Sequence, residues 1–347
     1  MRYKMFGSRT GLKVSEFALG TGMLGLKFGY GTAPDEARRI LGRYIDAGGN
    51  LFDISDAYQG GESESMVGAF IANRRDDFVI ATKYSLTSDA STAGLAALGN
   101  SRKAMAQAVE LSLKRLKTDR IDIYLAHLDD GVTPIEEIAR GFDDLARAGK
   151  ILYAGLANFP AWRVATAATI ADLRGWVPLS AIQVEYSLLQ RTTERDLLPM
   201  ADAFGLEVLA YSTLAAGILT AKYRKGERGR ATEFRVGVAY ADSDNEGVLD
   251  VLIRIAGELA TEPGRVAIAW ASAKGVLPIL GPRTRAQLDD NLAASGIRLS
   301  TDQIGRLDAV SAAPAGYPHD LLAGEGSRNA VNANRVSDID FPHQTVR

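Results

Sequence analysis

The sequence predicts an α/β fold, namely a (β/α)8 TIM-type barrel with an N-terminal β-hairpin, extra loops and a C-terminal tail. Three observations lead to this prediction. Short apolar or β-branched runs recur along the 347 residues, and most start about 26–43 residues apart, the size of one strand–helix unit. Longer amphipathic segments separate them. The runs are almost continuously apolar, as expected of parallel strands covered on both faces.

The expected strands follow in order along the chain. They are EFALG (16–20), LFDIS (51–55), FVIATK (78–83), IDIYLAH (121–127), ILYAGLAN (151–158), AIQVEY (181–186), LEVLAYS (206–212) and VLPILG (276–281). Residues 2–15 precede them, and SRTG at 8–11 fits a hairpin turn that would close the bottom of the barrel. A doubly wound sheet is the main alternative, but no G-x-G-x-x-G opens a helix after the first strand.

The intervening segments have helical spacing. Residues 35–47 and 102–117 place their apolar side chains on one face, and Gly48-Gly49 follows the first of them. The sequence TPIE at 133–136 predicts an N-cap threonine, a proline at the first helical position and a capping-box glutamate. The helix that it opens is expected to stop at Gly149.

No segment has the composition of a linker, so we expect a single domain over residues 1–347. Its core is expected to span about residues 3–312, with a C-terminal tail over 313–347. The polar stretch 222–246 and the tail stand outside the strand–helix repeat, and 84–101 is a long loop expected beside the barrel mouth. Long loops in compact domains are usually functional or disordered, so 222–235 is either a solvated loop or a strap over a bound pyrophosphate.

Composition excludes several classes of function. The 40 basic and 42 acidic residues give a formal net charge of −2, which predicts neither nucleic-acid nor membrane binding. The absence of cysteine excludes disulfides, zinc–thiolate sites and thiol nucleophiles. With only His127, His319 and His343, a multi-histidine metal site is poorly supplied, and we predict no metal. A charged N-terminus without an apolar core predicts no signal peptide and a cytoplasmic protein.

Polar residues lie at or just after the C-terminal ends of most of the predicted strands. In a barrel of this kind those ends converge on one mouth, where active sites lie. They are Asp53 and Tyr58 after the second strand, Lys83 on the third, His127 on the fourth, Asn158 on the fifth, Gln183 and Glu185 on the sixth, Tyr211 and Ser212 on the seventh, and Gly281 to Arg283 after the eighth. Each alone could be a capping acid, a loop aromatic, a solvated lysine or a structural histidine.

Four of these residues make chemical sense as a set. A phenol titrates near ~10, too weak an acid for proton donation at neutral pH. We expect Lys83 to lower the pKa of Tyr58, Asp53 to hold the lysine, and His127 to orient a carbonyl oxygen. The implied reaction is proton donation to a carbonyl oxygen that gains negative charge, with hydride from a cofactor.

The order of motifs resembles that of the aldo-keto reductase superfamily over roughly residues 3–295. The motifs are LFDISDAY-x-GGESE, VIATK, IYLAH, GLANF, IQVEYSLLQR, LAYSTLAAGILTAKY and GPRTRAQLDDN. The resemblance implies a barrel that binds NADPH in extended form, without excluding NADH, and that reduces aldehydes and ketones. It also implies that Asp53, Tyr58, Lys83 and His127 are the catalytic tetrad, with Tyr58 as the general acid.

The resemblance further implies a cofactor site. Asn158 and Gln183 match residues that bond the nicotinamide carboxamide, Tyr211 matches the aromatic that stacks on the ring, and Arg283 matches the 2′-phosphate segment. The complete expected set is Thr21, Asp53, Asn158, Gln183, Tyr211, Ser212, Leu214, Gly217, Lys222, Gly281, Arg283, Gln287, Asp290 and Asn291. For the small-molecule carbonyl substrate we expect an apolar pocket formed by Met23, Leu24, Tyr84, Leu128 and Trp162.

Some positions depart from the family pattern. Ala157 stands where serine is common before the asparagine, Thr213 stands where proline is common, and Pro282 follows Gly281. The style of the motifs also resembles potassium-channel β subunits, which leaves a redox-sensing protein with little turnover as an alternative. Those subunits carry asparagine where this chain has His127, which disfavours that alternative. A Schiff-base aldolase built on Lys83 is a third and weaker possibility.

Overall fold

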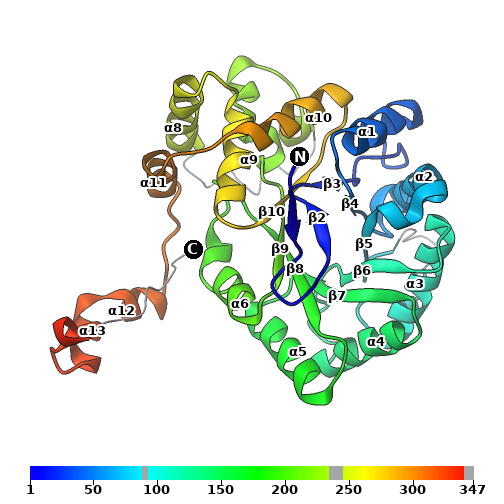
Figure 1. The fold of residues 1–347 in the computed structure, drawn as a ribbon, viewed down its shortest axis with the longest axis horizontal. Coiled ribbons are helices and arrows are strands. Elements are labelled where there is room, and N and C mark those ends of the chain that lie inside the picture. Colours follow the sequence, from blue (N-terminus) through cyan, green and yellow to red (C-terminus); the bar gives the residue numbers. More distant parts are fainter. Residues whose placement is uncertain (88–92, 234–244, 340–347) are drawn as a thin grey trace.

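The computed structural model describes residues 1–87, 93–233 and 245–339. Eight parallel strands close into a barrel in the order β10-β3-β4-β5-β6-β7-β8-β9, and helices surround it (Figure 1). The strands are β3 (Ala18–Gly20), β4 (Leu51–Asp53), β5 (Val79–Tyr84), β6 (Ile121–Ala126), β7 (Ile151–Ala157), β8 (Leu179–Glu185), β9 (Glu207–Tyr211) and β10 (Leu277–Leu280). All eight lie on predicted strands, and the prediction of a TIM-type barrel is confirmed.

An antiparallel hairpin closes the bottom of the barrel, as predicted. Strands β1 (Tyr3–Met5) and β2 (Lys13–Ser15) pair, and Phe6 N donates to Leu12 O at 2.9 Å across the turn. The buried side chains Phe6 and Val14 pack in one cluster with residues of the barrel strands, including Leu51 and Ile123. The hairpin accordingly lies across the centre of the barrel in Figure 1.

Helices alternate with the barrel strands, as expected, and further helices lie in the segments outside the strand–helix repeat. They are α1 (Pro34–Asp46), α2 (Glu62–Ile71), α3 (Arg102–Leu116), α4 (Ile135–Arg147), α5 (Ala161–Arg174), α6 (Leu197–Phe204), α7 (Arg230–Glu233), α8 (Asn245–Glu258), α9 (Pro263–Ala273), α10 (Arg285–Leu292), α11 (Thr301–Val310), α12 (His319–Ala323) and α13 (Glu325–Val331). Helices α1 and α3 agree with the predicted ranges to within one residue.

The predicted capping box at the start of α4 is wrong. The helix begins at Ile135 after Pro134, and no side chain caps it. The Thr133 hydroxyl instead donates to Asp130 Oδ2 at 2.6 Å, and the amides of Val132 and Thr133 donate to Asp130 Oδ1. The carboxylate of Asp130, a stronger acceptor than a hydroxyl, organises this loop.

Helices α12 and α13 extend away from the barrel on the C-terminal side (Figure 1). They lie within the expected tail over 313–347, of which residues 340–347, including His343, lie outside the described residues. Parts of the two long loops also fall outside the described residues, namely 88–92 of loop 84–101 and 234–244 of segment 222–246.

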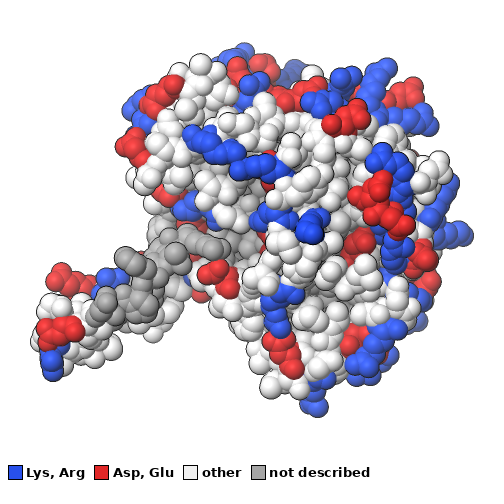
Figure 2. All heavy atoms as spheres, viewed as in Figure 1, with Lys and Arg blue, Asp and Glu red and all other residues white. Residues whose placement is uncertain are grey.

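The surface carries charges of both signs. On the face shown in Figure 2, basic and acidic side chains are interspersed over the barrel and its helices. Within the three described ranges, no helix is both long enough and apolar enough to cross a membrane.

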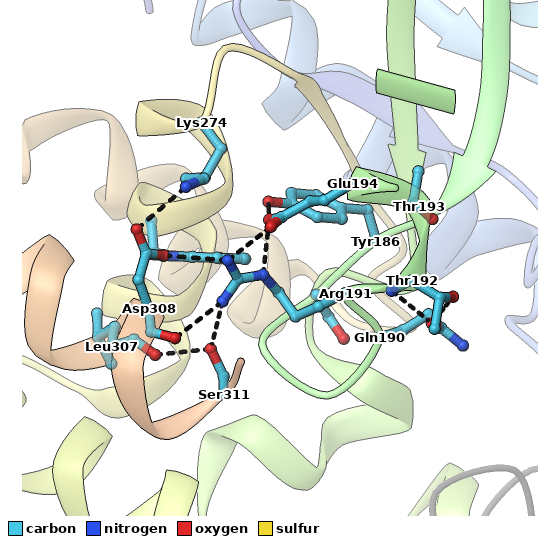
Figure 3. A network of polar contacts seen from close by, with 12 residues as sticks. Tyr186, Gln190, Arg191, Thr192, Thr193, Glu194, Lys274, Leu307, Asp308 and Ser311 are labelled. Atoms are coloured by element: carbon cyan, nitrogen blue, oxygen red, sulfur yellow. Dashed lines mark hydrogen bonds and ion pairs between the residues drawn. The ribbon is translucent and has the colours of Figure 1, made fainter. Parts of the chain in front are cut away.

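A buried polar network ties helix α11 to the loop that follows β8 (Figure 3). Arg191 donates from Nε and Nη2 to the carboxylate of Glu194 at 2.6 and 2.7 Å, and from Nη1 to Ser311 Oγ at 2.6 Å. Its guanidinium lies 5.0 Å from the ring centroid of Trp270, whose Nε1 donates to Asp308 at 2.9 Å. One cation therefore joins three segments that are distant in sequence.

We predict that Arg191→Ala lowers the free energy of unfolding by about 1.5–3 kcal/mol, because it removes a buried guanidinium and leaves Glu194 without its cation, whereas Asp308 keeps its ion pair with Lys274. Thermal and denaturant unfolding measure this change. Arg38→Ala is the matched control, since the Arg38 side chain is 70% exposed, and it should change stability by less than about 0.5 kcal/mol. Equal effects of the two substitutions would contradict a structural role for the network.

Candidate active site

The barrel brings Asp53, Tyr58, Lys83 and His127 to one end. Asp53 is the last residue of β4, Lys83 lies on β5, and His127 directly follows β6. Tyr58 begins the short 3-10 turn Tyr58–Gly61 that follows β4. Asp53 and Lys83 are buried, with 3% and 0% of their surface exposed.

Lys83 is the centre of the group. Its Nζ lies 2.8 Å from Asp53 Oδ1, donates to the Ile54 carbonyl at 2.6 Å and donates to the Tyr58 hydroxyl at 3.3 Å. An ammonium has three protons, so these contacts use its full donor capacity. The position of the lysine is therefore fixed relative to the tyrosine oxygen.

The turn that carries Tyr58 is held by its own neighbours. Gln59, Gly60 and Gly61 have φ angles of 49°, 61° and 88°, a left-handed backbone that glycine adopts without strain. The buried Gln59 side chain donates to the carbonyls of Gly22 and Tyr30 at 3.3 and 3.1 Å. This contact fixes the segment after β3 next to the tyrosine ring.

Burial dominates the acidity of Tyr58. It raises the pKa of the hydroxyl above its usual value, and the positive charge of Lys83 opposes this without cancelling it. The expectation of a net lowered pKa is therefore wrong for the protein alone, although the expected contribution of Lys83 is present. The reason is that desolvation of a phenolate costs more here than one ammonium restores.

Lys83 and His127 have opposite charge states. Burial lowers the pKa of Lys83, but Asp53 and Tyr58 raise it by more, so the lysine remains an ammonium at neutral pH. Burial, followed by the charge of Lys83, lowers the pKa of His127 to about 3. His127 is thus a neutral imidazole, and its ring meets the Tyr58 ring edge-on with centroids 5.7 Å apart.

The three residues expected at the nicotinamide lie beside this group and are already joined to it. Gln183 Nε2 donates to Asp53 Oδ1 at 2.6 Å, the oxygen that also pairs with Lys83. Asn158 donates to the His127 carbonyl at 2.9 Å and accepts from the Tyr211 hydroxyl at 2.8 Å. The half-exposed Tyr211 ring lies at the mouth, where a planar group could stack on it.

The segment expected to meet a pyrophosphate follows β9. Ser212 has a φ of 56° and Gly217 one of 90°, so the backbone turns sharply there. Lys222 is half-buried, and its ammonium lies 5.2 Å from the Tyr223 ring centroid. Two other residues of the expected cofactor set make contacts within the protein. Leu214 packs against the core, and the Thr21 hydroxyl donates to Asp53 O at 2.9 Å.

The segment expected to meet the 2′-phosphate lies between β10 and α10. The guanidinium of Arg283 lies 4.3 Å from the Tyr30 ring centroid. Its amide donates to Gln287 Oε1 at 2.8 Å. A planar guanidinium stacked on an aromatic ring suits recognition of a phosphate dianion, so these residues fit NADPH. Gly281 has open space around it, Asp290 pairs with Arg265 at 2.7 Å, and Asn291 is buried.

The expected substrate pocket needs two corrections. Tyr84 is fully buried, with its ring stacked on Tyr124 at 5.3 Å and edge-on to Phe142. Successive strand residues point to opposite faces, so Lys83 points into the barrel and Tyr84 toward the helices. Leu24 is 1% exposed and belongs to the core. Met23, Leu128 and Trp162 stay accessible, the last two 42% and 66% exposed.

Sequence reasoning missed a second set of contacts beside His127. Ser55 Oγ lies 3.1 Å from His127 Nδ1 and donates to Asp56 Oδ1 at 3.2 Å. Both residues are buried and occupy the stretch between Asp53 and Tyr58. The sequence feature that could have indicated them is their polarity directly after a strand end. Nothing in the spacing of the residues shows that they contact the histidine.

Comparison with known proteins decides the family. The profile of the aldo/keto reductase family matches residues 16–312. This chain belongs to that family. It is 36% identical over 333 residues to an uncharacterized oxidoreductase, YrpG, of Bacillus subtilis (strain 168), a match that covers 93% of this chain and all of the relative.

Two relatives have names that state an activity. The chain is 33% identical over 347 residues to the aryl-alcohol dehydrogenase [NADP(+)] of Phanerodontia chrysosporium, covering 94% and 90% of the two chains. It is 31% identical over 336 residues to the norsolorinic acid reductase of Aspergillus flavus, covering 92% and 84%. The chain is therefore an oxidoreductase of the aldo/keto reductase family.

We predict that His127 stays uncharged from pH 9 down to about pH 4, because burial and Lys83 disfavour the imidazolium. Side-chain ¹⁵N NMR of histidine-labelled protein measures the charge, and the signal missing from a His127→Asn variant is that of His127. A charge transition near pH 6.5, the usual value, would show that the ring is solvated and would contradict this placement.

Proposed function

We propose that this aldo/keto reductase reduces aryl aldehydes and ketones to alcohols with NADPH and oxidises the alcohols in the reverse direction. The observation that carries the proposal is the position of the Tyr58 hydroxyl, 3.3 Å from an ammonium that Asp53 holds in a buried site. The names of relatives, an aryl-alcohol dehydrogenase and a norsolorinic acid reductase, support the aromatic substrate class.

In the proposed reduction, Tyr58 donates its phenolic proton to the carbonyl oxygen. When bound, the nicotinamide supplies the hydride that reaches the carbonyl carbon. The ammonium of Lys83 stabilises the phenolate left on Tyr58, and Asp53 keeps that ammonium at 2.8 Å. The raised pKa of Tyr58 keeps the hydroxyl protonated before reaction, as a proton donor requires.

The residues at the mouth have distinct proposed tasks. Tyr211 would stack on the nicotinamide ring, while Asn158 and Gln183 would bond its carboxamide and fix the face that is presented. Arg283 would hold the 2′-phosphate. Leu128 and Trp162 supply an apolar and aromatic wall for the substrate, because both lie after barrel strands and keep much of their side chains exposed.

We predict that Tyr58→Phe lowers kcat/KM for carbonyl reduction by about 10²–10⁴-fold, the usual worth of a general acid. The Kd for NADPH should stay within the same order of magnitude, because the phenyl ring keeps its packing on Gly22 and His127. Steady-state kinetics and NADPH fluorescence titration measure the two quantities. Unchanged turnover in this variant would remove Tyr58 as the acid.

We predict that Arg283→Ala weakens NADPH binding by about tenfold to a hundredfold and leaves NADH binding nearly unchanged, because only NADPH carries the 2′-phosphate. Arg285→Ala is the matched control, since the Arg285 side chain is 59% exposed and faces Asp289. Fluorescence titration of both cofactors measures the ratio. Equal losses of NADPH and NADH would contradict the proposed role of Arg283.

A panel of aryl aldehydes, aliphatic aldehydes and cyclic ketones tests the reaction itself. Steady NADPH consumption with aryl carbonyls is the expected result. Tight NADPH binding without turnover of any member would contradict the reductase proposal and favour a redox-sensing protein.

A further inference from the structure

A buried chain of polar contacts leads from His127 away from the mouth. His127 Nδ1 lies 3.1 Å from Ser55 Oγ, and Ser55 Oγ lies 3.2 Å from Asp56 Oδ1. The amide of Ala57 also donates to Ser55 Oγ at 3.3 Å. Ser55 and Asp56 are 0% and 4% exposed, so water does not compete for these contacts.

Counting protons leaves two arrangements of this chain. A serine hydroxyl has one proton and two lone pairs, and the Ala57 amide uses one lone pair. If the hydroxyl donates to an Asp56 carboxylate, it accepts from His127 Nδ1–H, and Nε2 carries a lone pair. If Asp56 is a carboxylic acid that donates to Ser55, the hydroxyl donates to Nδ1, and the proton of the neutral ring is on Nε2.

The surroundings of Asp56 make both arrangements accessible. Burial, followed by the negative charge of Glu64, raises the pKa of Asp56 to about 7, while Ser55 and Arg115 oppose this rise. Glu64 is fully buried and accepts from Thr82 Oγ1 at 2.7 Å and Arg115 Nε at 2.6 Å.

Tyr124, Lys83 and Tyr58 each keep one charge state near neutral pH. Burial raises the pKa of the adjacent Tyr124 hydroxyl far above neutrality, and Asp56 raises it further. On the His127 side the neighbours are Lys83 and Tyr58, both described above. Asp56 is therefore the member of the chain whose charge state changes near pH 7.

We propose that Ser55 and Asp56 are positioning residues that decide which nitrogen of His127 carries its proton. With Asp56 protonated, Nε2–H points into the mouth and donates to a carbonyl oxygen. With Asp56 ionised, Nε2 is an acceptor that suits the hydroxyl of an alcohol. Between the two forms the Asp56 proton moves to Ser55, the Ser55 proton moves to Nδ1, and Nε2 releases one proton to solvent.

This device rests on the proposed carbonyl reduction for its effect on rate, but not for the tautomer itself. At lower pH the Nε2–H form favours reduction, because the ring then adds a donor to the oxygen that gains charge. At higher pH the acceptor form favours alcohol oxidation. Asp56 would thus set the pH range in which each direction is fastest, without touching the substrate and without changing the equilibrium.

The test is side-chain ¹⁵N NMR of the full-length histidine-labelled protein with and without NADPH. We expect Nε2–H below about pH 6 and Nδ1–H above about pH 8, with the ring neutral throughout, because the transition follows Asp56. Asp56→Asn should make the tautomer independent of pH, and Ser55→Ala should uncouple it from this transition. Ser180→Ala, a buried serine that donates only to Ala154 O, should behave as wild type.

Kinetics then separate this proposal from the proposed function. For wild type, kcat for reduction should fall as pH rises through about 7, and Asp56→Asn should flatten that limb with little change in the KM for NADPH. A single wild-type tautomer from pH 5.5 to 9, or an unchanged tautomer transition in Asp56→Asn, would overturn the inference even if carbonyls are reduced. Failure to reduce any carbonyl, with the tautomer transition intact, would overturn only the proposed function.

Discussion

The buried ion pair between Lys83 and Asp53 is the interaction on which the rest of the site depends. An ammonium with no exposed surface is costly unless it is paired and its protons are accepted, and here Asp53, the Ile54 carbonyl and Tyr58 accept them. The barrel makes this possible because adjacent parallel strands end at one level, so Asp53 and Lys83 meet without any long loop. The same aspartate oxygen accepts from Gln183 on the opposite side of the barrel.

Burial and neighbouring charges give Tyr58, His127 and Lys83 different charge states. Burial keeps Tyr58 protonated and His127 neutral, while the Asp53 carboxylate keeps Lys83 charged. The ammonium therefore acts on the tyrosine oxygen at close range, and the imidazole contributes a hydrogen bond rather than a charge. Which kind of hydrogen bond it contributes depends on Ser55 and Asp56, two residues outside the four that meet at the mouth.

The fold and the four polar residues at its mouth could be predicted because the C-terminal ends of parallel strands all lie at the same end of a barrel. Near-continuous apolar runs marked all eight strands, and reading their last residues brought Asp53, Lys83 and His127 together. Strand alternation would also have excluded Tyr84 once Lys83 was assigned to the interior. The contact of Ser55 with His127 could not be predicted, because it joins side chains 72 residues apart through a turn whose path is not encoded by periodicity. The predicted lowering of the Tyr58 pKa was wrong, because the burial that raises this pKa depends on packing around the whole mouth.

The pKa of Tyr58 tests the central claim most directly, since the claim is that the Lys83–Asp53 pair makes the phenol a stronger acid than burial alone would allow. It can be followed by ¹³Cζ NMR of tyrosine-labelled protein in the wild type and in the Asp53→Asn/Lys83→Met double variant, which removes both charges together. A pKa that is higher in the double variant than in the wild type is the predicted result, because the effect of Lys83 exceeds that of Asp53. An equal or lower pKa in the double variant would contradict it.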